Sequence, residues 1–285
     1  MLGRRATFWE LYLPPLLWLS LFFIVPLLLM AAYSFRADMR GELFQNFTPT
    51  LKQYDVLLAG GSYWRLLGIS ALMALTIAIS ATILSYPIAY FLAFRAGRNA
   101  GRYLVLLLVP FWTSYLLRVM AWKIILGSDG VLNSFLQYLG LIDQPLTALL
   151  YNRGTVIITL IYVWVPFAAL PILAALQRID LALFEAASDL GANPVRRFLR
   201  VTFPLSLPGV LATFFMVFIP TIGEYVTPLL VGGSEGSMYG NIIQDFFTKA
   251  ANWPLGSALS MAMLVGTLAL VFIAVRSIDL RRLVE

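Results

Sequence analysis

Apolar residues along this chain gather in six long runs, and polar residues lie mainly in the segments between them. A helix needs about 20 apolar residues to cross a bilayer, and each run comes close to that length or exceeds it. The pattern therefore predicts an all-α integral membrane protein with six transmembrane helices, forming a single domain over residues 1–285. The predicted spans are Leu11–Tyr33, Leu66–Phe94, Tyr103–Leu126, Thr155–Leu176, Gly209–Val231 and Ser257–Val275.

The first run also has a feature of a secretory signal, because Arg4 and Arg5 precede it. It is longer than a typical signal core and lacks a convincing small-x-small cleavage site. We therefore predict that it is retained as a span.

The basic residues between the runs predict the orientation of the spans. Lysine and arginine are enriched in cytoplasmic segments of membrane proteins. If the N-terminus is cytoplasmic, twelve of the 20 basic residues face the cytoplasm, and most of the acidic residues lie in the outside loops. Both termini are therefore predicted to be cytoplasmic. The twelve are Arg4, Arg5, Arg95, Arg98, Arg102, Arg178, Arg196, Arg197, Arg200, Arg276, Arg281 and Arg282.

The composition leaves this protein little chemistry of its own. Hydrophobic residues make up 60% of the chain and charged residues 12%, whereas soluble domains average about 25% charged. Cysteine and histidine are absent, which excludes thiol nucleophiles, imidazole bases and zinc sites built on nitrogen or sulfur ligands. No phosphate-binding Gly-rich loop occurs, and no basic, aromatic-lined soluble face suggests nucleic acid. We expect no catalytic residue, no metal site and no cofactor in this chain, and no nucleic-acid partner.

The longest inside segment, residues 177–208, is predicted to form two short helices. Phe184 and Ala187 lie on one face of the first helix with Leu181 and Leu190, whereas the acids Glu185 and Asp189 share another. Gly191 is a suitable terminator of the first helix. Asn193 and Pro194 are typical of the cap and first turn of a second helix, which Pro204 and Pro208 are expected to end before the fifth span.

Two interpretations of this segment compete. It could be an ordinary loop whose arginines only set the topology. Alternatively, a compact pair of helices with small residues and paired acids suits docking to a cytoplasmic partner, and we favour this interpretation.

A family resemblance supports docking. Glu185-Ala186-Ala187-x-x-x-Gly191, followed after nine residues by Val201-Thr202-Phe203-Pro204, resembles the EAA motif of permease subunits of binding-protein-dependent ABC importers. The family pattern ends in Ile-x-Leu-Pro, and Val201 and Phe203 keep its apolar character. Over nearly the whole chain, the resemblance is closest to the permeases of spermidine/putrescine importers, and among these to the first of the two permeases. Three segments carry it, namely Val109–Arg118, Gly127–Asn133 and Asn252–Gly256.

The resemblance implies a fold, a location and a set of partners. It implies the type I ABC importer permease (MetI-like) fold in the bacterial inner membrane, with a second homologous permease, two cytoplasmic ATP-binding subunits and a periplasmic substrate-binding protein. ATP and magnesium would be bound by the ATPase subunits and not by this chain. The substrate implied is a polyamine, with another amine, an opine or an amino-acid derivative as alternatives. The residues implied to couple to the ATPase are Glu185, Ala186, Ala187, Asp189, Gly191 and Pro204.

A carboxylate within the fifth span marks a candidate substrate pathway. A charge near the centre of a membrane helix costs about 2.5–3.5 kcal/mol on insertion scales. The presence of Glu224 in the span therefore indicates a structural or functional role for its carboxylate. Pro220, Gly223 and Pro228 predict a broken helix around it, which is tolerated where protein or water satisfies the freed backbone. We predict that Glu224 faces the pathway and attracts a cation, with Tyr225 and Thr227 nearby. The alternative is a structural ion pair with a basic residue of another helix.

Aromatic residues in the third span form a second candidate for the pathway. Trp112, Tyr115 and Trp122 lie on one side of a continuous helix, together with Val119, and aromatic faces bind ammonium groups. Such stripes are more often packing or interface residues, and that alternative stays open. Arg118 and Lys123 lie close to the same side and would repel a cation unless they are paired, for instance with an acid of an outside loop or of the partner permease.

Two other classes of protein remain as rivals to an importer subunit. An ion-coupled secondary transporter would show a second, paired set of broken helices within one chain, and we find no inverted repeat. An intramembrane enzyme would need a catalytic constellation in the spans, which the few ionisable residues there do not supply.

Overall fold

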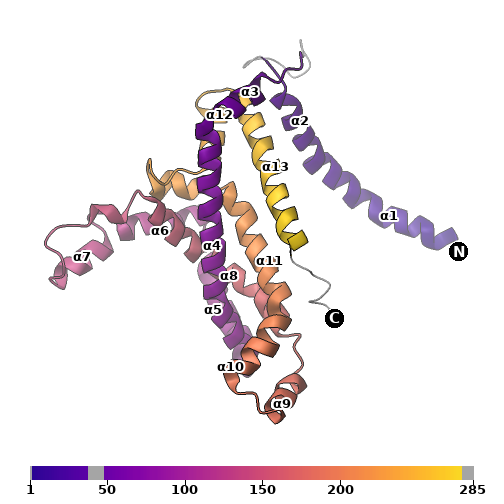
Figure 1. The fold of residues 1–285 in the computed structure, drawn as a ribbon, viewed down its shortest axis with the longest axis vertical. Helices are drawn as coiled ribbons and strands as arrows, with labels where there is room; N and C mark the ends of the chain where they lie inside the picture. The colour runs from indigo at the N-terminus through magenta and orange to yellow at the C-terminus, as the bar shows by residue number, and fades with distance from the viewer. Residues whose placement is uncertain (1, 38–47, 278–285) are drawn as a thin grey trace. The chain divides into compact units, whose positions relative to one another are not determined.

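The computed structural model describes residues 2–37 and 48–277, and this part of the chain is helical (Figure 1). Outside the helices, the described residues contain one isolated bridge, between Arg36 and Pro49. The α-helices are α1 Leu2–Leu19, α2 Val25–Ser34, α3 Lys52–Ala59, α4 Gly61–Phe94, α5 Ala100–Leu108, α6 Tyr115–Leu126, α7 Val131–Tyr138, α8 Arg153–Leu176, α9 Ala182–Asp189, α10 Pro194–Arg197, α11 Phe203–Ile222, α12 Tyr239–Thr248 and α13 Trp253–Ser277. Short 3-10 or π-helical segments are η1 Ser20–Ile24, η2 Gly97–Asn99, η3 Val109–Trp112, η4 Thr147–Leu149, η5 Phe198–Thr202 and η6 Pro228–Gly232.

Four of the six predicted spans lie within single helical stretches, and the fifth, Gly209–Val231, is interrupted after Ile222. Among the described residues, five stretches are long and apolar enough to cross a membrane: Glu10–Ser34, Gly61–Phe94, Arg153–Leu176, Pro194–Ile222 and Trp253–Ala274. The prediction of an all-helical membrane protein is therefore confirmed, with five candidate spans in the described residues, or six if the bent pair Gly97–Trp112 and Tyr115–Tyr138 counts as one.

The third predicted span, Tyr103–Leu126, is wrong as a continuous helix. The stretches Gly97–Trp112 and Tyr115–Tyr138 meet at 82°. Thr113 and Ser114 between them have extended backbones, with ψ of 155° and 137°. Pro110, just before the bend, has no N–H to donate to the preceding turn.

The end predicted for the second helix of the 177–208 segment is also wrong. Neither Pro204 nor Pro208 ends it, because α10, η5 and α11 form one helical stretch from Pro194 to Ile222. The π-helical turn η5 lets the Phe203 N–H reach back five residues to the Phe198 carbonyl. This widened turn directly precedes Pro204, whose missing N–H would otherwise interrupt the regular hydrogen-bond pattern.

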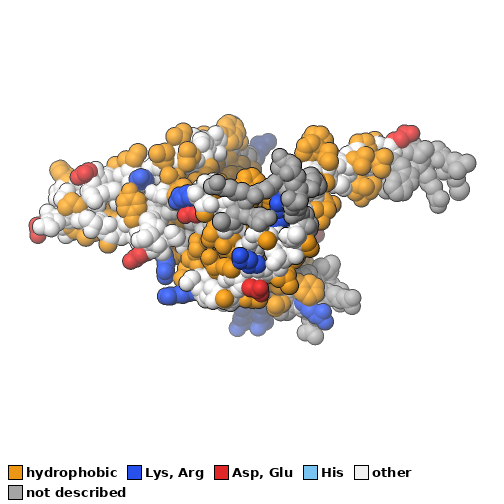
Figure 2. All heavy atoms as spheres, turned by 90° about the horizontal axis from the view of Figure 1, so that it is seen from above, with side chains coloured by type: hydrophobic (Ala, Val, Ile, Leu, Met, Phe, Trp, Pro, Cys, Tyr) orange, Lys and Arg blue, Asp and Glu red, His pale blue; other side chains and the backbone are white. Residues whose placement is uncertain are grey.

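The chain forms two compact units, Met1–Trp64 with Ile242–Gly266 and Arg65–Asn241 with Thr267–Glu285. In the first unit, the Ser34 hydroxyl is 2.8 Å from the Tyr54 hydroxyl, and Trp253 packs near Tyr33 and Phe247, with ring centroids 6.0 Å away in each case. None of residues 10–24, the described side chains of α1 and η1, is buried. Exposed apolar side chains of this kind are spread over the visible face in Figure 2, as expected for a surface in contact with lipid.

In the second unit, α4, α8 and α11 pack together through small and hydroxyl residues. The Ser85 hydroxyl donates to the Val165 carbonyl at 2.7 Å, and the Thr213 hydroxyl donates to the Ala168 carbonyl at 3.0 Å. Hydroxyl contacts and small residues are the usual means by which membrane helices associate closely. The apolar core at one end of these helices contains Ala89, Leu92, Ala96, Ala169, Ile172, Leu173, Leu176 and Ile179.

Candidate coupling and translocation sites

The two predicted helices of the 177–208 segment are confirmed as α9 and α10. The Asp180 carboxylate accepts the Ala182 N–H at the start of α9. Gly191 follows α9 with φ of 77°, the left-handed conformation that glycine adopts without steric cost. The Asn193 side chain then accepts the Arg196 N–H at 2.8 Å and caps α10. Local capping signals in the sequence therefore set this geometry.

The residues proposed for coupling lie together at the end of the second unit formed by α9 and α10 (Figure 1). Glu185, Ala186 and Asp189 are exposed, and Ala187 is half-buried. A side chain added at Gly191 would meet nothing within 4 Å. Leu190 is 88% exposed, so α9 presents acids and an uncovered leucine on its surface. Pro204 does not belong to this surface, because it lies half-buried in the helical stretch beyond η5.

One aromatic residue connects α9 to the spans. The Phe184 ring packs edge-on against Phe94 at the end of α4, with centroids 5.2 Å apart, and the Arg197 guanidinium lies 5.3 Å from the Phe184 ring. The same segment continues without interruption from α10 into α11. α9 is therefore connected to the membrane helices in two ways. Phe184 packs against the end of α4, and the chain continues from α9 through α10 into α11.

The predicted break near Glu224 is confirmed. α11 ends at Ile222, and a second helical stretch begins at Val226. One carboxylate oxygen of Glu224 accepts the N–H groups of Val226 and Thr227 at 2.8 and 3.1 Å. Glu224 thus caps the second stretch, where an anion is favoured by the helix dipole.

The alternative prediction, an ion pair between Glu224 and a basic residue of another helix, is not observed among the described residues. The ion pair observed among them, with charged atoms within 4 Å, joins Lys249 to Asp245. Tyr225, predicted near the pathway, is exposed, and Thr227 is buried. The Glu224 carboxylate is therefore held by backbone N–H groups, interacts with the Tyr115 side chain, and has no ion-pair partner within 4 Å in the described part of the chain.

The sequence analysis missed the residues that hold the break in place. The Asn241 amide donates to the Tyr225 carbonyl at 2.8 Å, and its oxygen accepts the Met238 N–H at 2.9 Å. A Cβ at Gly240 would lie 2.5 Å from the Gly223 carbonyl oxygen, so only glycine fits there. The Tyr239 N–H donates to the buried Ser70 hydroxyl. Gly240 and Asn241 lie in a segment whose sequence reads as an outside loop, and no local pattern marks them.

The bend in the third span divides the aromatic stripe predicted there. Trp112 precedes the bend and is 80% exposed, so it does not share one continuous helix with Tyr115 and Trp122. The Tyr115 hydroxyl hydrogen-bonds Thr227, and the Trp122 ring lies 5.6 Å from that of Tyr162. These two aromatic residues pack against the protein, as the alternative interpretation allowed, and Tyr115 reaches the helical stretch that Glu224 caps.

The two basic residues of this span contact aromatic rings. The Arg118 guanidinium lies 4.5 Å from the Phe111 ring centroid, and the Lys123 amine lies 5.8 Å from that of Tyr151. Two nitrogen atoms of Arg118 are buried without a hydrogen-bond partner among the described residues. Neither cation has a carboxylate partner in the described part of the chain, so the predicted acid pairing is not met there.

The structure combines helices long and apolar enough to cross a membrane, a helix broken at a carboxylate and an exposed helical hairpin, as expected for the transmembrane subunit of a transporter. Residues 69–283 match the family described as the binding-protein-dependent transport system inner membrane component, and the chain belongs to this family. It is a multi-pass inner-membrane permease of an ABC importer, in which ATP is hydrolysed by a separate subunit.

Curated relatives match over most of the chain. It is 36% identical over 259 residues to the spermidine/putrescine transport system permease protein PotB of Escherichia coli (strain K12), covering 90% of this chain and 92% of that protein. PotB of Haemophilus influenzae is 35% identical, with 91% and 90% covered. The inner membrane ABC transporter permease protein YdcU of Escherichia coli (strain K12) is 30% identical, with 90% and 84% covered.

Solved structures agree on the fold. A chain of the bacterial alginate ABC transporter, in complex with an alginate pentasaccharide-bound periplasmic protein, has a TM-score of 0.74 at 17% identity, with 95% of this chain and 93% of that chain covered. A chain of the MetNI methionine ABC transporter has a TM-score of 0.55 at 16% identity, with 79% and 99% covered. The fold is that of ABC importer permeases.

Proposed function

We propose that this permease forms half of the pathway of an importer for small organic cations, with spermidine and putrescine as substrates. The observation that carries the proposal is the Glu224 carboxylate at a broken helix, where no basic side chain of the described part pairs with it. A carboxylate without an ion-pair partner favours a cationic substrate. The names of the relatives that match nearly the whole chain point to the same substrates.

The proposal includes the topology and the partners. Both termini lie in the cytoplasm, residues 1–285 act as one permease domain, and a second homologous permease completes the pathway. Residues 177–208 form the cytoplasmic coupling loop, on which an ATPase subunit docks through Glu185, Ala186, Ala187, Asp189 and Gly191. The exposed acids of α9 and the excess of basic residues on the same side of the spans support this arrangement.

The proposed mechanism follows the helical stretch from the loop to the break. Closure of the ATPases would move α9, and the movement would pass along α10, η5 and α11 to the turn at Gly223 and Glu224. A break in a helix is a natural hinge, because its backbone lacks regular hydrogen bonds. Movement there would change which side of the membrane Glu224 faces.

The substrate proposal is tested by transport measurements on the whole importer. Vesicles containing this permease with its partner permease and ATPases, supplied with the cognate binding protein, should take up radiolabelled spermidine only when ATP is present. Alginate oligosaccharide serves as a control substrate that lacks a cationic group. Spermidine uptake without ATPase subunits, or none with the complete importer, would contradict the proposal.

Glu224→Gln tests the role of the carboxylate. The amide keeps an oxygen that can cap the Val226 and Thr227 N–H groups but removes the charge, so the fold should be retained. We expect the half-saturating concentration of spermidine to rise about fivefold or more, equivalent to roughly 1 kcal/mol. Glu235→Gln, at an exposed acid away from the break, is the control. Unchanged uptake kinetics in Glu224→Gln would leave capping as the sole role of Glu224.

A further inference from the structure

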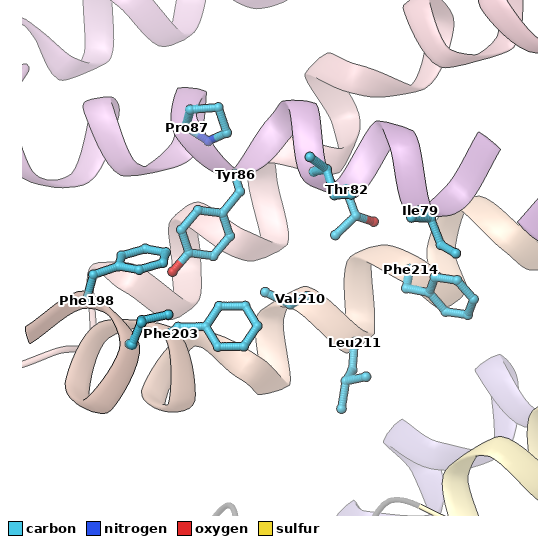
Figure 3. A pocket seen from close by; sticks show the side chains of 11 residues that line it. Ile79, Thr82, Tyr86, Pro87, Phe198, Phe203, Val210, Leu211 and Phe214 are labelled. Carbon is cyan, nitrogen blue, oxygen red and sulfur yellow. The ribbon is translucent and has the colours of Figure 1, made fainter. Parts of the chain in front are cut away.

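An open apolar groove of about 530 Å³ lies between α4 and the helical stretch formed by η5 and α11 (Figure 3). The Tyr86 ring points from α4 toward Phe198 and Phe203, and its hydroxyl is 2.8 Å from that of Ser206. Ile83 and Leu199 on the groove walls are exposed. The lining residues are Ile79, Thr82, Ile83, Tyr86, Pro87, Phe198, Leu199, Phe203, Val210, Leu211 and Phe214. All belong to helices long and apolar enough to span the membrane, so the occupant of the groove must be apolar.

Three arginines lie on the segment that forms one end of this groove. Arg196, Arg197 and Arg200 line a second hollow of about 230 Å³, next to Ala187 and Leu190. Phe198 and Leu199, which line the groove, lie between Arg196 and Arg200 in the sequence. No carboxylate pairs with these arginines among the described residues. The segment at this end of the groove is therefore basic, and its arginines have no paired carboxylate in the described part of the chain.

We propose that this site binds an anionic phospholipid, with an acyl chain in the groove and the phosphate on Arg196 and Arg200. Basic pockets beside membrane helices bind anionic headgroups. From Phe203 to Phe214, α11 rises about 16 Å, close to the ~15 Å of one leaflet of hydrocarbon. A transmembrane helix of the partner permease would fill the apolar groove but would not by itself supply an anion for the arginines.

The groove has walls from two distant parts of the sequence, α4 on one side and the η5–α11 stretch on the other. The bound lipid would join α4 to η5, the turn that follows the coupling loop.

Photocrosslinking of the whole importer tests the proposal without depending on transport. The probe is phosphatidylglycerol with a diazirine on its acyl chain, mixed into phosphatidylcholine vesicles that contain the complex. We expect labelled peptides from residues 79–87 and 203–214, with competition by unlabelled phosphatidylglycerol but not by phosphatidylcholine or inorganic phosphate. Labelling should fall about tenfold in an Arg196→Gln, Arg200→Gln double variant, because each arginine near the surface strengthens anionic-lipid binding.

Matched variants separate this site from general attraction to the membrane. Arg98→Gln with Arg102→Gln removes two exposed arginines elsewhere and should change labelling by less than about twofold. Leu211→Trp should fill the groove and abolish labelling, whereas Leu268→Trp on α13 should not. Equal labelling of all exposed helix faces, or full labelling in the double variant, would overturn the proposal. Competition by inorganic phosphate would indicate a free-anion site, and labelling that appears only when the second permease is removed would indicate a helix in the groove.

Discussion

Gly191→Trp should reduce substrate uptake about tenfold or more, while ATP hydrolysis by the complex continues. Gly191 ends α9 at the proposed docking surface, and space for a side chain is open within 4 Å. The Cβ of a tryptophan there would meet no atom of the described chain within 4 Å, and we expect the bulky ring to separate α9 from a docked ATPase. Uptake and ATP hydrolysis are measured together in vesicles containing the whole importer, so that uncoupling is distinguished from loss of the complex.

Gly140→Trp is the control for backbone strain. Gly140 has φ of 67° and Gly191 φ of 77°, and neither has an atom within 4 Å of an added Cβ. The cost of placing a side chain in the left-handed conformation, about 1–2 kcal/mol, is therefore similar in the two variants. Only Gly191 lies beside the acids of α9. Equal losses of uptake in the two variants, or normal uptake in Gly191→Trp, would contradict a docking role for this surface.

A change of charge at the same surface should have the same consequence. Glu185 is exposed, so Glu185→Lys should alter the stability of this chain by about 0.5 kcal/mol or less. Asp143→Lys makes the same change of charge at another exposed acid and should leave uptake normal. If Glu185→Lys transports normally, the acid of α9 does not take part in docking.

Features that depend on local sequence could be predicted for this protein. Hydrophobic length was sufficient to predict the four unbroken spans, because the backbone hydrogen bonds of a membrane helix are made within one segment. The cap at Asn193 and the turn at Gly191 follow from the same few residues that form them. The break after Ile222 was predictable for the same reason, since Gly223 and the prolines around it act on their own turn.

Features that depend on contacts between distant segments could not be predicted in this way. Asn241 is one amide in a polar segment, and only the fold places it against the Tyr225 carbonyl. Pro204 is normally a helix breaker, yet the π-helical turn before it allows the helix to continue. Trp112 and Tyr115 share a face only if the helix between them is continuous, and the extended backbone at Thr113 prevents that. The identity of the substrate is likewise not predictable from local sequence, because it depends on which side chains from distant segments lie around Glu224.

Gly209→Val should strongly destabilise the protein, because α11 packs against α8 at Gly209 with no room for a side chain. A Cβ at this position would lie 2.5 Å from the Ala175 Cβ and 2.7 Å from the Pro171 carbonyl oxygen. Main-chain atoms of α8 cannot move away cheaply, since the Thr213 hydroxyl bonds the Ala168 carbonyl of the same helix. Overpacking of this kind costs about 1–3 kcal/mol, which predicts a melting temperature lower by roughly 4–10 °C.

Gly68→Val separates this clash from the general effect of valine in a helix. Gly68 lies inside α4, and a Cβ there would meet nothing within 4 Å. Gly68→Val therefore changes the helix propensity without introducing a steric clash at the Cβ. That change is small, because valine is a better helix former than glycine. Thermal unfolding of the purified complex, followed by size-exclusion fluorescence, should therefore show a loss for Gly209→Val and almost none for Gly68→Val. Equal melting temperatures for the two variants would mean that α8 and α11 are not held as closely as Thr213 and Gly209 place them, and the route from the coupling loop to Glu224 would then lack its rigid support.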